Sequence, residues 1–275
     1  MARAQTRPSG AHQEFDIDAF KSRSIPVTLE GIDLHDFVDH PLDPSTLRCL
    51  RYMHDVEYHT VCYLRDLLVT PAHRDPTVTT FLTLWNVEEM YHGDAISAVL
   101  AAHGEPAGRD RVSDTRQRLG AFDRIAPAAH AIGSIVVGSA WTAVHMTWGA
   151  VNEWTAQAAY ARLGQIADHP TLSTLLARIM RQEGRHADFY ARQAERRLCD
   201  DAKARWLTRT ALRRWWAPVG STLLPPREVS FLASHLFTGD EGRAMTRRID
   251  RRLDQLPGLS GLGLTTGAAQ RLIAA

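Results

Sequence analysis

The stretch "NVEEMYHGD", residues 86–94, decides the fold, because it places charged groups on the otherwise apolar face of a helix. The apolar residues that define this face on both sides are Phe81, Trp85, Ile96 and Val99. Glu89 and His92 interrupt the face, and such groups are costly to bury without a partner. The stretch therefore predicts a long core helix whose Glu-x-x-His pair needs a partner in the interior.

A second Glu-x-x-His pair occurs in "RIMRQEGRHADFY", residues 178–190. Glu183 and His186 share an apolar stripe with Ile179 and Tyr190, as expected for residues three or four apart on a helix. One such pair is a weak signal, because neighbours of this spacing need only share a face. Two pairs, both on core faces, indicate a common purpose.

Two further long helices each carry one glutamate on the buried stripe, Glu57 and Glu153. Four carboxylates and two imidazoles are the set that ferritin-like di-iron or di-manganese bundles project inward. Two divalent cations would neutralise the carboxylates and accept both imidazoles, so they would make the burial tolerable. We therefore predict an all-α chain, a ferritin-like four-helix bundle with additional C-terminal helices. The predicted metal ligands and catalytic residues are Glu57, Glu89, His92, Glu153, Glu183 and His186.

Other polar residues compete for these roles. Glu88 also lies one turn from His92, but only Glu89 has the spacing of the second pair. His54 and His59 lie off the Glu57 stripe and are expected at the surface.

The third long helix carries another stripe, formed by Trp141, His145 and Trp148. It lies about 140° around the helix from Glu153, so it cannot line the metal site. The sequence leaves open whether it packs against a neighbouring helix or forms a dimer interface.

The long helices are expected from the cap signal "DPST" to near Pro71, then over about residues 77–103, 132–168 and 170–199. The polar stretch 105–120 is expected to loop out. We divide the chain into an N-terminal arm (1–43), a ferritin-like di-iron helical domain (44–255) with shorter helices after residue 200, and a loosely packed Gly-rich tail (256–275).

Composition excludes several classes of protein. The chain has 275 residues, 44% hydrophobic and 23% charged, which suits one large globular domain. A formal net charge of +1 gives no field that would favour nucleic acid. The isolated Cys49, Cys62 and Cys199 fit a reducing compartment. No segment approaches the roughly 18 apolar residues of a membrane span, so we expect a cytoplasmic protein.

Three segments resemble motifs of the soluble acyl-acyl carrier protein desaturases. "WNVEEMYHGD" (85–94) is similar to their W-x-x-E-E-x-x-H-G-D box, and "QEGRH" (182–186) to their D-E-x-R-H box. "NEWTAQAAY" (152–160) stands where their third-helix glutamate lies. The resemblance is specific over about residues 47–195.

The resemblance implies a di-iron, O₂-dependent desaturase that introduces a double bond into a carrier-bound fatty acyl chain. It implies two Fe²⁺ ions per chain, with manganese as the alternative, an acyl carrier protein or other acyl carrier, a ferredoxin-type electron donor and a homodimer. It also implies that Glu88 orients His186 and that Gln182 orients His92. The family has an acidic residue at position 182 and an N-terminal Trp, whereas the first Trp here is Trp85.

Two sets of residues suggest where a carrier and its acyl chain would bind. Small residues on the third helix would leave room for a chain or permit close helix packing: Gly138, Ser139, Ala143, Gly149 and Ala150. A run of arginines from Arg192 to Arg214 would receive an acidic carrier or form a solvated face, and the predicted docking residues in it are Arg205, Arg209, Arg213 and Arg214. The alternative functions are another ferritin-like di-iron oxygenase or oxidase and a non-catalytic metal-binding relative.

Overall fold

The computed structural model describes residues 14–117 and 119–274, and within these ranges the chain forms α-helices and one short 3-10 helix but no β-strand. The predicted all-α class is confirmed. The first 13 residues of the expected arm and the last residue of the expected tail lie outside the described ranges.

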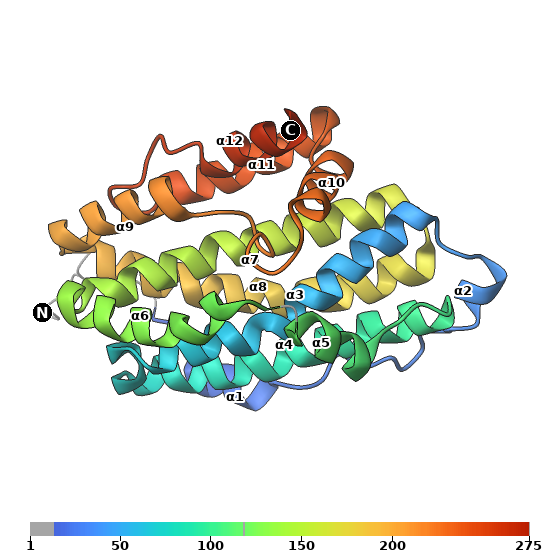
Figure 1. Ribbon diagram of the computed structural model, residues 1–275, viewed down its shortest axis with the longest axis horizontal. Helices are drawn as coiled ribbons and strands as arrows, with labels where there is room; N and C mark the ends of the chain where they lie inside the picture. The colour runs from blue at the N-terminus through green and yellow to red at the C-terminus, as the bar shows by residue number, and fades with distance from the viewer. Residues whose placement is uncertain (1–13, 118, 275) are drawn as a thin grey trace, which may run out of the picture.

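Four long helices run side by side along the length of the molecule (Figure 1). They are α3 (Pro44–Leu68), α4 (Pro76–Ala102), α7 (Ala140–Ala167) and α8 (Pro170–Cys199). The most extensive packing is between α7 and α8 and between α3 and α4, and α4 also contacts α8 as α3 contacts α7. Each of the four therefore has two neighbours within the bundle.

The starts of these helices follow from their sequence. Asp43 and Asp75 each accept two backbone N–H bonds from the first turn of α3 and α4, and each is followed by a proline. A capping carboxylate and a proline at the first helical position are both favourable, because the first N–H groups have no partner within the helix. His169 caps α8 in the same way, before Pro170.

The predicted third helix is divided in the structure. Residues 121–137 form α6 (Ala121–Val137), and α7 begins only at Ala140. The chain breaks at Gly138, whose φ of 75° is a conformation that glycine adopts without strain. The stretch expected to loop out contains a helix, α5 (Gly108–Gln117), so that expectation was wrong.

The ends of the described chain are also more ordered than expected. The arm contains two short helices, α1 (Ile17–Arg23) and α2 (Asp36–Asp39). The expected loosely packed tail forms α12 (Leu264–Ala274), which packs on α10 (Pro226–Leu236) and α11 (Gly239–Asp254). Asp250 accepts bonds from the N–H groups of Thr265 and Thr266, so a side chain of α11 caps α12. This long-range cap is why local Gly content misled the prediction.

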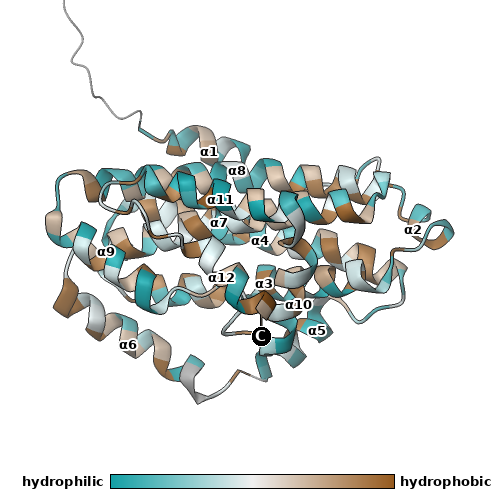
Figure 2. Ribbon diagram, turned by 90° about the horizontal axis from the view of Figure 1, so that it is seen from above, coloured by the Kyte–Doolittle hydropathy of each residue, from teal (hydrophilic) through white to brown (hydrophobic). Residues whose placement is uncertain are grey.

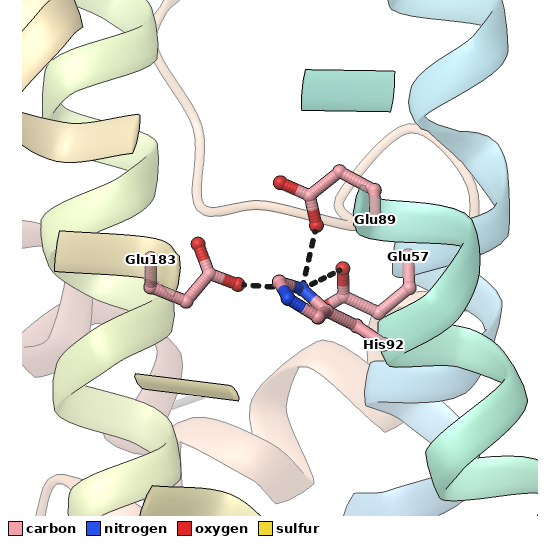
Figure 3. Close-up of side chains that lie close together, drawn as sticks. All are labelled: Glu57, Glu89, His92 and Glu183. Atoms are coloured by element: carbon pink, nitrogen blue, oxygen red, sulfur yellow. Dashed lines mark hydrogen bonds and ion pairs between the residues drawn. The ribbon is translucent and has the colours of Figure 1, made fainter. Parts of the chain in front are cut away.

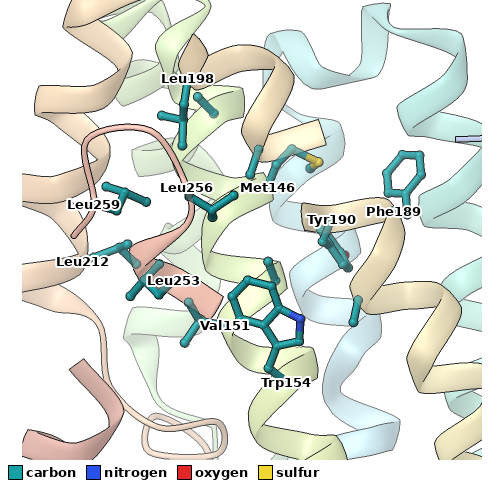
Figure 4. Packing of buried hydrophobic residues seen from close by; sticks show 14 of the residues in the cluster. Met146, Val151, Trp154, Phe189, Tyr190, Leu198, Leu212, Leu253, Leu256 and Leu259 are labelled. Atoms are coloured by element: carbon teal, nitrogen blue, oxygen red, sulfur yellow. The ribbon is translucent and has the colours of Figure 1, made fainter. Parts of the chain in front are cut away.

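The C-terminal helices form a second layer over α7 (Figure 1). Within it, α9 (Ala202–Trp215) and α11 both contact α7. Most of the side chains packed between α7 and these two helices are aliphatic, and Trp154 of α7 packs with them (Figure 4). None of the helices in the described part of the chain is sufficiently long and apolar to span a membrane.

Two apolar clusters lie at opposite ends of the bundle. One contains Phe81 of α4 and Tyr190 of α8. The other contains Ile96 of α4 and Ile179 of α8. The helices α4 and α8 pass these two clusters in opposite order. The polar residues that lie between the two clusters on each helix therefore meet at mid-bundle, with an apolar layer at either end.

Candidate metal centre

The structure brings all six predicted ligands together at mid-bundle. Glu57 comes from α3, Glu89 and His92 from α4, Glu153 from α7, and Glu183 and His186 from α8. The exposed fraction of each is 6% or less. They form two groups of four, each offering ligand atoms within 4.8 Å of one another, and the groups share Glu89 and Glu183.

Glu89 and Glu183 each face both histidines. His92 Nδ1 lies 3.1 Å from Glu89 Oε2 and 3.3 Å from Glu183 Oε1 (Figure 3). His186 Nδ1 lies 3.1 Å from the other oxygen of Glu89 and 3.3 Å from the other oxygen of Glu183. Each of these two carboxylates therefore turns one oxygen to each histidine and belongs to both groups of ligand atoms.

Glu57 and Glu153 occupy the outer positions. Glu57 Oε2 lies 3.7 Å from His92 Nδ1, and Glu153 Oε2 lies 3.9 Å from His186 Nδ1. The remaining oxygen of each accepts a hydrogen bond from an aromatic side chain: Tyr160 OH donates to Glu57, and Trp85 Nε1 donates to Glu153 at 3.0 Å. These donors fix the outer carboxylates and leave one oxygen of each pointing inward.

Sequence reasoning did not assign a role to Tyr160 or to the Trp85 indole. Tyr160 follows Glu153 by two helical turns, and Trp85 precedes Glu89 by one, so both lie on the core faces. That spacing was the available signal. It could not show that Tyr160 would serve a glutamate of another helix.

The outer nitrogens of both histidines donate to side chains of the opposite helix. His92 Nε2 lies 2.8 Å from Gln182 Oε1, and His186 Nε2 lies 2.7 Å from Glu88 Oε2. These are the partners that the resemblance implied. Partners of this kind fix the imidazole tautomer and ring orientation, so each Nδ1 lone pair is directed to the centre.

The N-terminal arm completes this outer layer. Gln182 Nε2 donates to the carbonyl of Ile25 at 2.8 Å, which fixes the orientation of its amide. Arg185 donates to Glu88 at 2.8 Å and to the carbonyl of Arg23 at 3.0 Å. The arm therefore orders both residues that orient the histidines. A glutamine at position 182 is explained by Ile25, since an aspartate would offer its carbonyl no donor.

The protonation of the cluster shows how its charge is balanced. Burial, reinforced by neighbouring carboxylates, raises the pKa of Glu57 and of Glu153 well above the ordinary value. Burial also acts on Glu89, but hydrogen bonds from Glu57 and the histidines outweigh it and lower the pKa of this carboxyl. Burial opposes charge on His92 and His186, yet hydrogen bonds to the carboxylates hold the pKa of both well above the ordinary value.

These directions favour protons on Glu57, Glu153 and both imidazoles when no metal is bound. Two divalent cations would balance the charge of four ionised carboxylates. The donor set of carboxylate oxygens and imidazole nitrogens suits iron or manganese. The residues present therefore fit a pair of metal ions.

Glu88 and His54, two other polar residues near the centre, lie outside the two groups of ligand atoms. Glu88, the competitor of Glu89, points to His186 and Arg185 rather than to the two groups of ligand atoms. His54 was expected at the surface, but it is fully buried and bonds to Asp55 and to the N–H of Gly108. That expectation was wrong because α5, which covers it, was not predicted. His59 is half-buried.

The small residues of α7 serve close packing. A Cβ on Gly149 would lie 2.4 Å from the ring of Tyr190, and Ala143 and Ala150 are fully buried. The aromatic stripe also packs internally, because the Trp141 ring lies against Gly133 of α6. For Gly149, Ala143 and Ala150 the structure thus shows close helix packing and not room for an acyl chain. For Trp141 it shows packing against the neighbouring helix α6.

The arginine run is divided between structural and exposed members. Arg205 donates to the carbonyls of Leu198 and Cys199, and Arg209 to those of Gly258 and Ser260. Arg213 and Arg214 are exposed. The predicted docking cluster is thereby reduced to the last two.

An apolar cavity lies beside the centre, between α3 and α7 on one side and α10, α11 and α12 on the other. Its wall is almost entirely apolar. Glu57 and Tyr160 contribute to this wall, as does Trp216 in the segment after α9. One of the two outer glutamates therefore forms part of the cavity wall.

Comparison with known proteins gave no match to a family model and no match to a curated protein.

The first prediction concerns metal stoichiometry. The wild-type chain should bind about two ions, because six donors form two groups. Glu57→Ala removes a donor from one group and should leave about one tightly bound ion. Glu89→Ala or Glu183→Ala removes a donor from both groups and should lower the content below one. Metal analysis after anaerobic loading with Fe²⁺ measures each value.

The control is Glu241→Ala, which removes a carboxylate that is 68% exposed on α11 and should leave binding unchanged. Two retained ions in Glu89→Ala would contradict the sharing of Glu89 by both groups of ligand atoms.

The second prediction concerns Gln182. Gln182→Glu places a charged acceptor on His92, which makes the imidazole a more basic ligand, so metal affinity should rise about tenfold. The same change removes the donor to Ile25, so the melting temperature of the metal-free protein should fall. Competition with a chelator and thermal unfolding measure the two effects. The exposed Gln165→Glu is the control, and an unchanged affinity in Gln182→Glu would show that residue 182 does not tune His92.

Proposed function

We propose that this protein is a di-iron, O₂-dependent oxidoreductase that introduces a double bond into a carrier-bound fatty acyl chain. The observation that carries the proposal is the apolar cavity whose wall includes Glu57 and Tyr160, because it joins the candidate metal centre to a space suited to a hydrocarbon. The motif resemblance supports desaturation in particular. The four-helix arrangement of two Glu-x-x-His pairs and two single glutamates supports a ferritin-like relationship.

Two iron ions bound by the six residues would supply the redox chemistry for O₂ reduction and hydrogen removal from the substrate. In the overall balance, adjacent CH₂ groups lose two hydrogens to give a CH=CH bond. Together with two electrons and two protons from an external one-electron donor, these hydrogens reduce one O₂ to two waters. The donor is proposed to be a ferredoxin-type protein.

The side chains around the centre serve positioning and the exclusion of water. Phe20 of the arm lies over Phe81 and His186, with ring centroids 5.2 Å and 6.3 Å from them. This aromatic cover keeps solvent from His186. On the opposite side Tyr160 remains protonated, because burial raises the pKa of its phenol well above the ordinary value. It therefore stays a hydrogen-bond donor to Glu57 at the end of the cavity.

Arg213 and Arg214 are proposed to receive the acidic acyl carrier. Both are exposed in the last turn of α9, and Trp216, just after the helix, lines the cavity. A carrier bound there would present its acyl group near the cavity, and the positive charge would speed encounter and fix orientation.

The third prediction tests the reaction. The iron-loaded protein, supplied with a chemical reductant, O₂ and acyl carrier protein thioesters, should consume O₂ and yield a product lighter by two hydrogens, measured by mass spectrometry. Glu183→Ala should abolish both signals, because it removes a donor shared by both groups.

The alternatives give different outcomes. A gain of oxygen mass would indicate an oxygenase, and O₂ uptake without a change in acyl mass would indicate an oxidase. Metal binding without O₂ uptake would indicate a non-catalytic relative. Each of these results would contradict desaturation.

The fourth prediction tests the carrier site. Arg213→Glu with Arg214→Glu should weaken carrier binding strongly at low salt and little at high salt, because the Debye length falls from about 10 Å at 0.1 M to about 3 Å at 1 M. Arg247→Glu with Arg248→Glu is a matched control, since it reverses two adjacent exposed arginines on α11. Affinity measured across salt concentrations should change only for the α9 pair, with iron content unchanged in both. Equal effects of the two double variants would place the carrier elsewhere.

A further inference from the structure

Helix α6 is oriented opposite to an ordinary surface helix, with polar residues toward the body and apolar residues toward solvent. Its polar residues other than Arg124 face the body: Asp123 pairs with Arg65 of α3 at 3.0 Å, and His130 lies 4.0 Å from Asp66 and against the Trp141 ring. Ser134 is 1% exposed. A surface helix normally presents these groups to water and its apolar residues to the core.

The outer face of α6 is correspondingly apolar. The exposed fractions are 59% for Ile125, 65% for Ile132, 79% for Ile135 and 78% for Val136. Ala128 and Ala129 fill the space between the first two. Figure 2 shows α6 at the outer edge of the molecule, where it contacts α3 and α7. The stripe runs from Ile125 to Val136, about 17 Å at 1.5 Å per residue, and it is the kind of patch that marks an interaction site.

The order of large and small residues along the stripe is self-complementary. In an antiparallel pair of α6 helices, a two-fold axis near residues 130 and 131 places Ala129 against the second copy's Ile132. By symmetry, Ile132 then lies against the second copy's Ala129. The same axis sets Ile125 against the second copy's Val136. Each large side chain then meets a small one at the centre, and β-branched side chains meet at both ends, as an isologous interface requires.

Charge complementarity agrees with this pairing. Arg124 is the exposed charged residue of α6, and it lies in the first turn, where the helix dipole disfavours a cation. Antiparallel pairing brings it beside the last turn of the second copy's α6, where the dipole favours a cation. A net charge of +1 for the chain opposes self-association little.

We propose that the outer face of α6 is the interface of a homodimer, with two α6 helices packed antiparallel about a two-fold axis. The occupant of the stripe is a second copy of this chain. A lipid surface would also cover apolar side chains, but membrane-binding helices are rich in basic residues beside the apolar face, and α6 carries Arg124 alone among Lys and Arg.

The fifth prediction tests this interface by sedimentation at protein concentrations from about 1 µM to about 100 µM. A dimer with an interface smaller than about 800 Å² per partner is expected to have its dissociation constant within this range. Wild type should form a dimer. Ile132→Lys, at the centre of the stripe, should raise the dimer dissociation constant at least tenfold, about 1.4 kcal/mol. Trp206→Lys is the matched control, because Trp206 is an apolar residue of α9 with an exposed fraction of 66%. The Trp206→Lys variant should remain dimeric.

Folding and the alternative occupant are tested with the same proteins. Unchanged helicity by circular dichroism and unchanged metal content exclude loss of fold, and Ile132→Ala provides a milder variant whose dimer should weaken in the same direction. A monomeric wild type over the whole range would overturn the proposal, whether or not it binds anionic vesicles. A wild-type dimer that persists in Ile132→Lys would also overturn it, since the interface would then lie elsewhere.

Discussion

The burial of four carboxylates at the middle of a helical bundle is the constraint on which the rest of this structure depends. Each isolated carboxylate would cost several kcal/mol to remove from water. The chain meets this cost with positive charge at the centre, carried by protons on the imidazoles or by metal ions, and with donors at every outer oxygen. Trp85 and Tyr160 serve the outer glutamates, and Glu88 and Gln182 serve the histidines. Removing any one of these leaves a buried polar atom without its partner, so the cluster is ordered as a unit.

The sequence predicted the features that repeat locally. Polar residues at helical spacing on apolar faces were sufficient to identify all six residues of the centre, and the caps at Asp43 and Asp75 located two helix starts. Features that depend on distant partners were not accessible. Nothing near Asp250 in the sequence indicates that it caps α12, and the burial of His54 depends on α5. The arginines show the same limit, because Arg205 and Arg209 have the composition of a docking patch but bind backbone carbonyls.

Gln182 illustrates how the arm and the centre are coupled. Its amide spans the two, accepting from His92 and donating to the carbonyl of Ile25. A carboxylate at this position would serve the histidine but repel the carbonyl. The neutral residue therefore follows from the path of the N-terminal arm, which runs across α8 here and where Arg178 donates to the carbonyls of Thr28 and Glu30.

The centre is nearly two-fold symmetric, but its surroundings are not. Each half has an outer glutamate, an aromatic donor, a histidine and a residue that orients the histidine. The half with Glu153 lies against Trp85, which packs on Tyr190 in the apolar cluster. The half with Glu57 borders the cavity beneath the C-terminal helices. Glu57 and Tyr160 line the cavity, whereas Glu153 and Trp85 do not, so the two groups of ligand atoms are alike in composition but differ in what lies beside them. The C-terminal helices thus give a nearly symmetric set of residues two different surroundings.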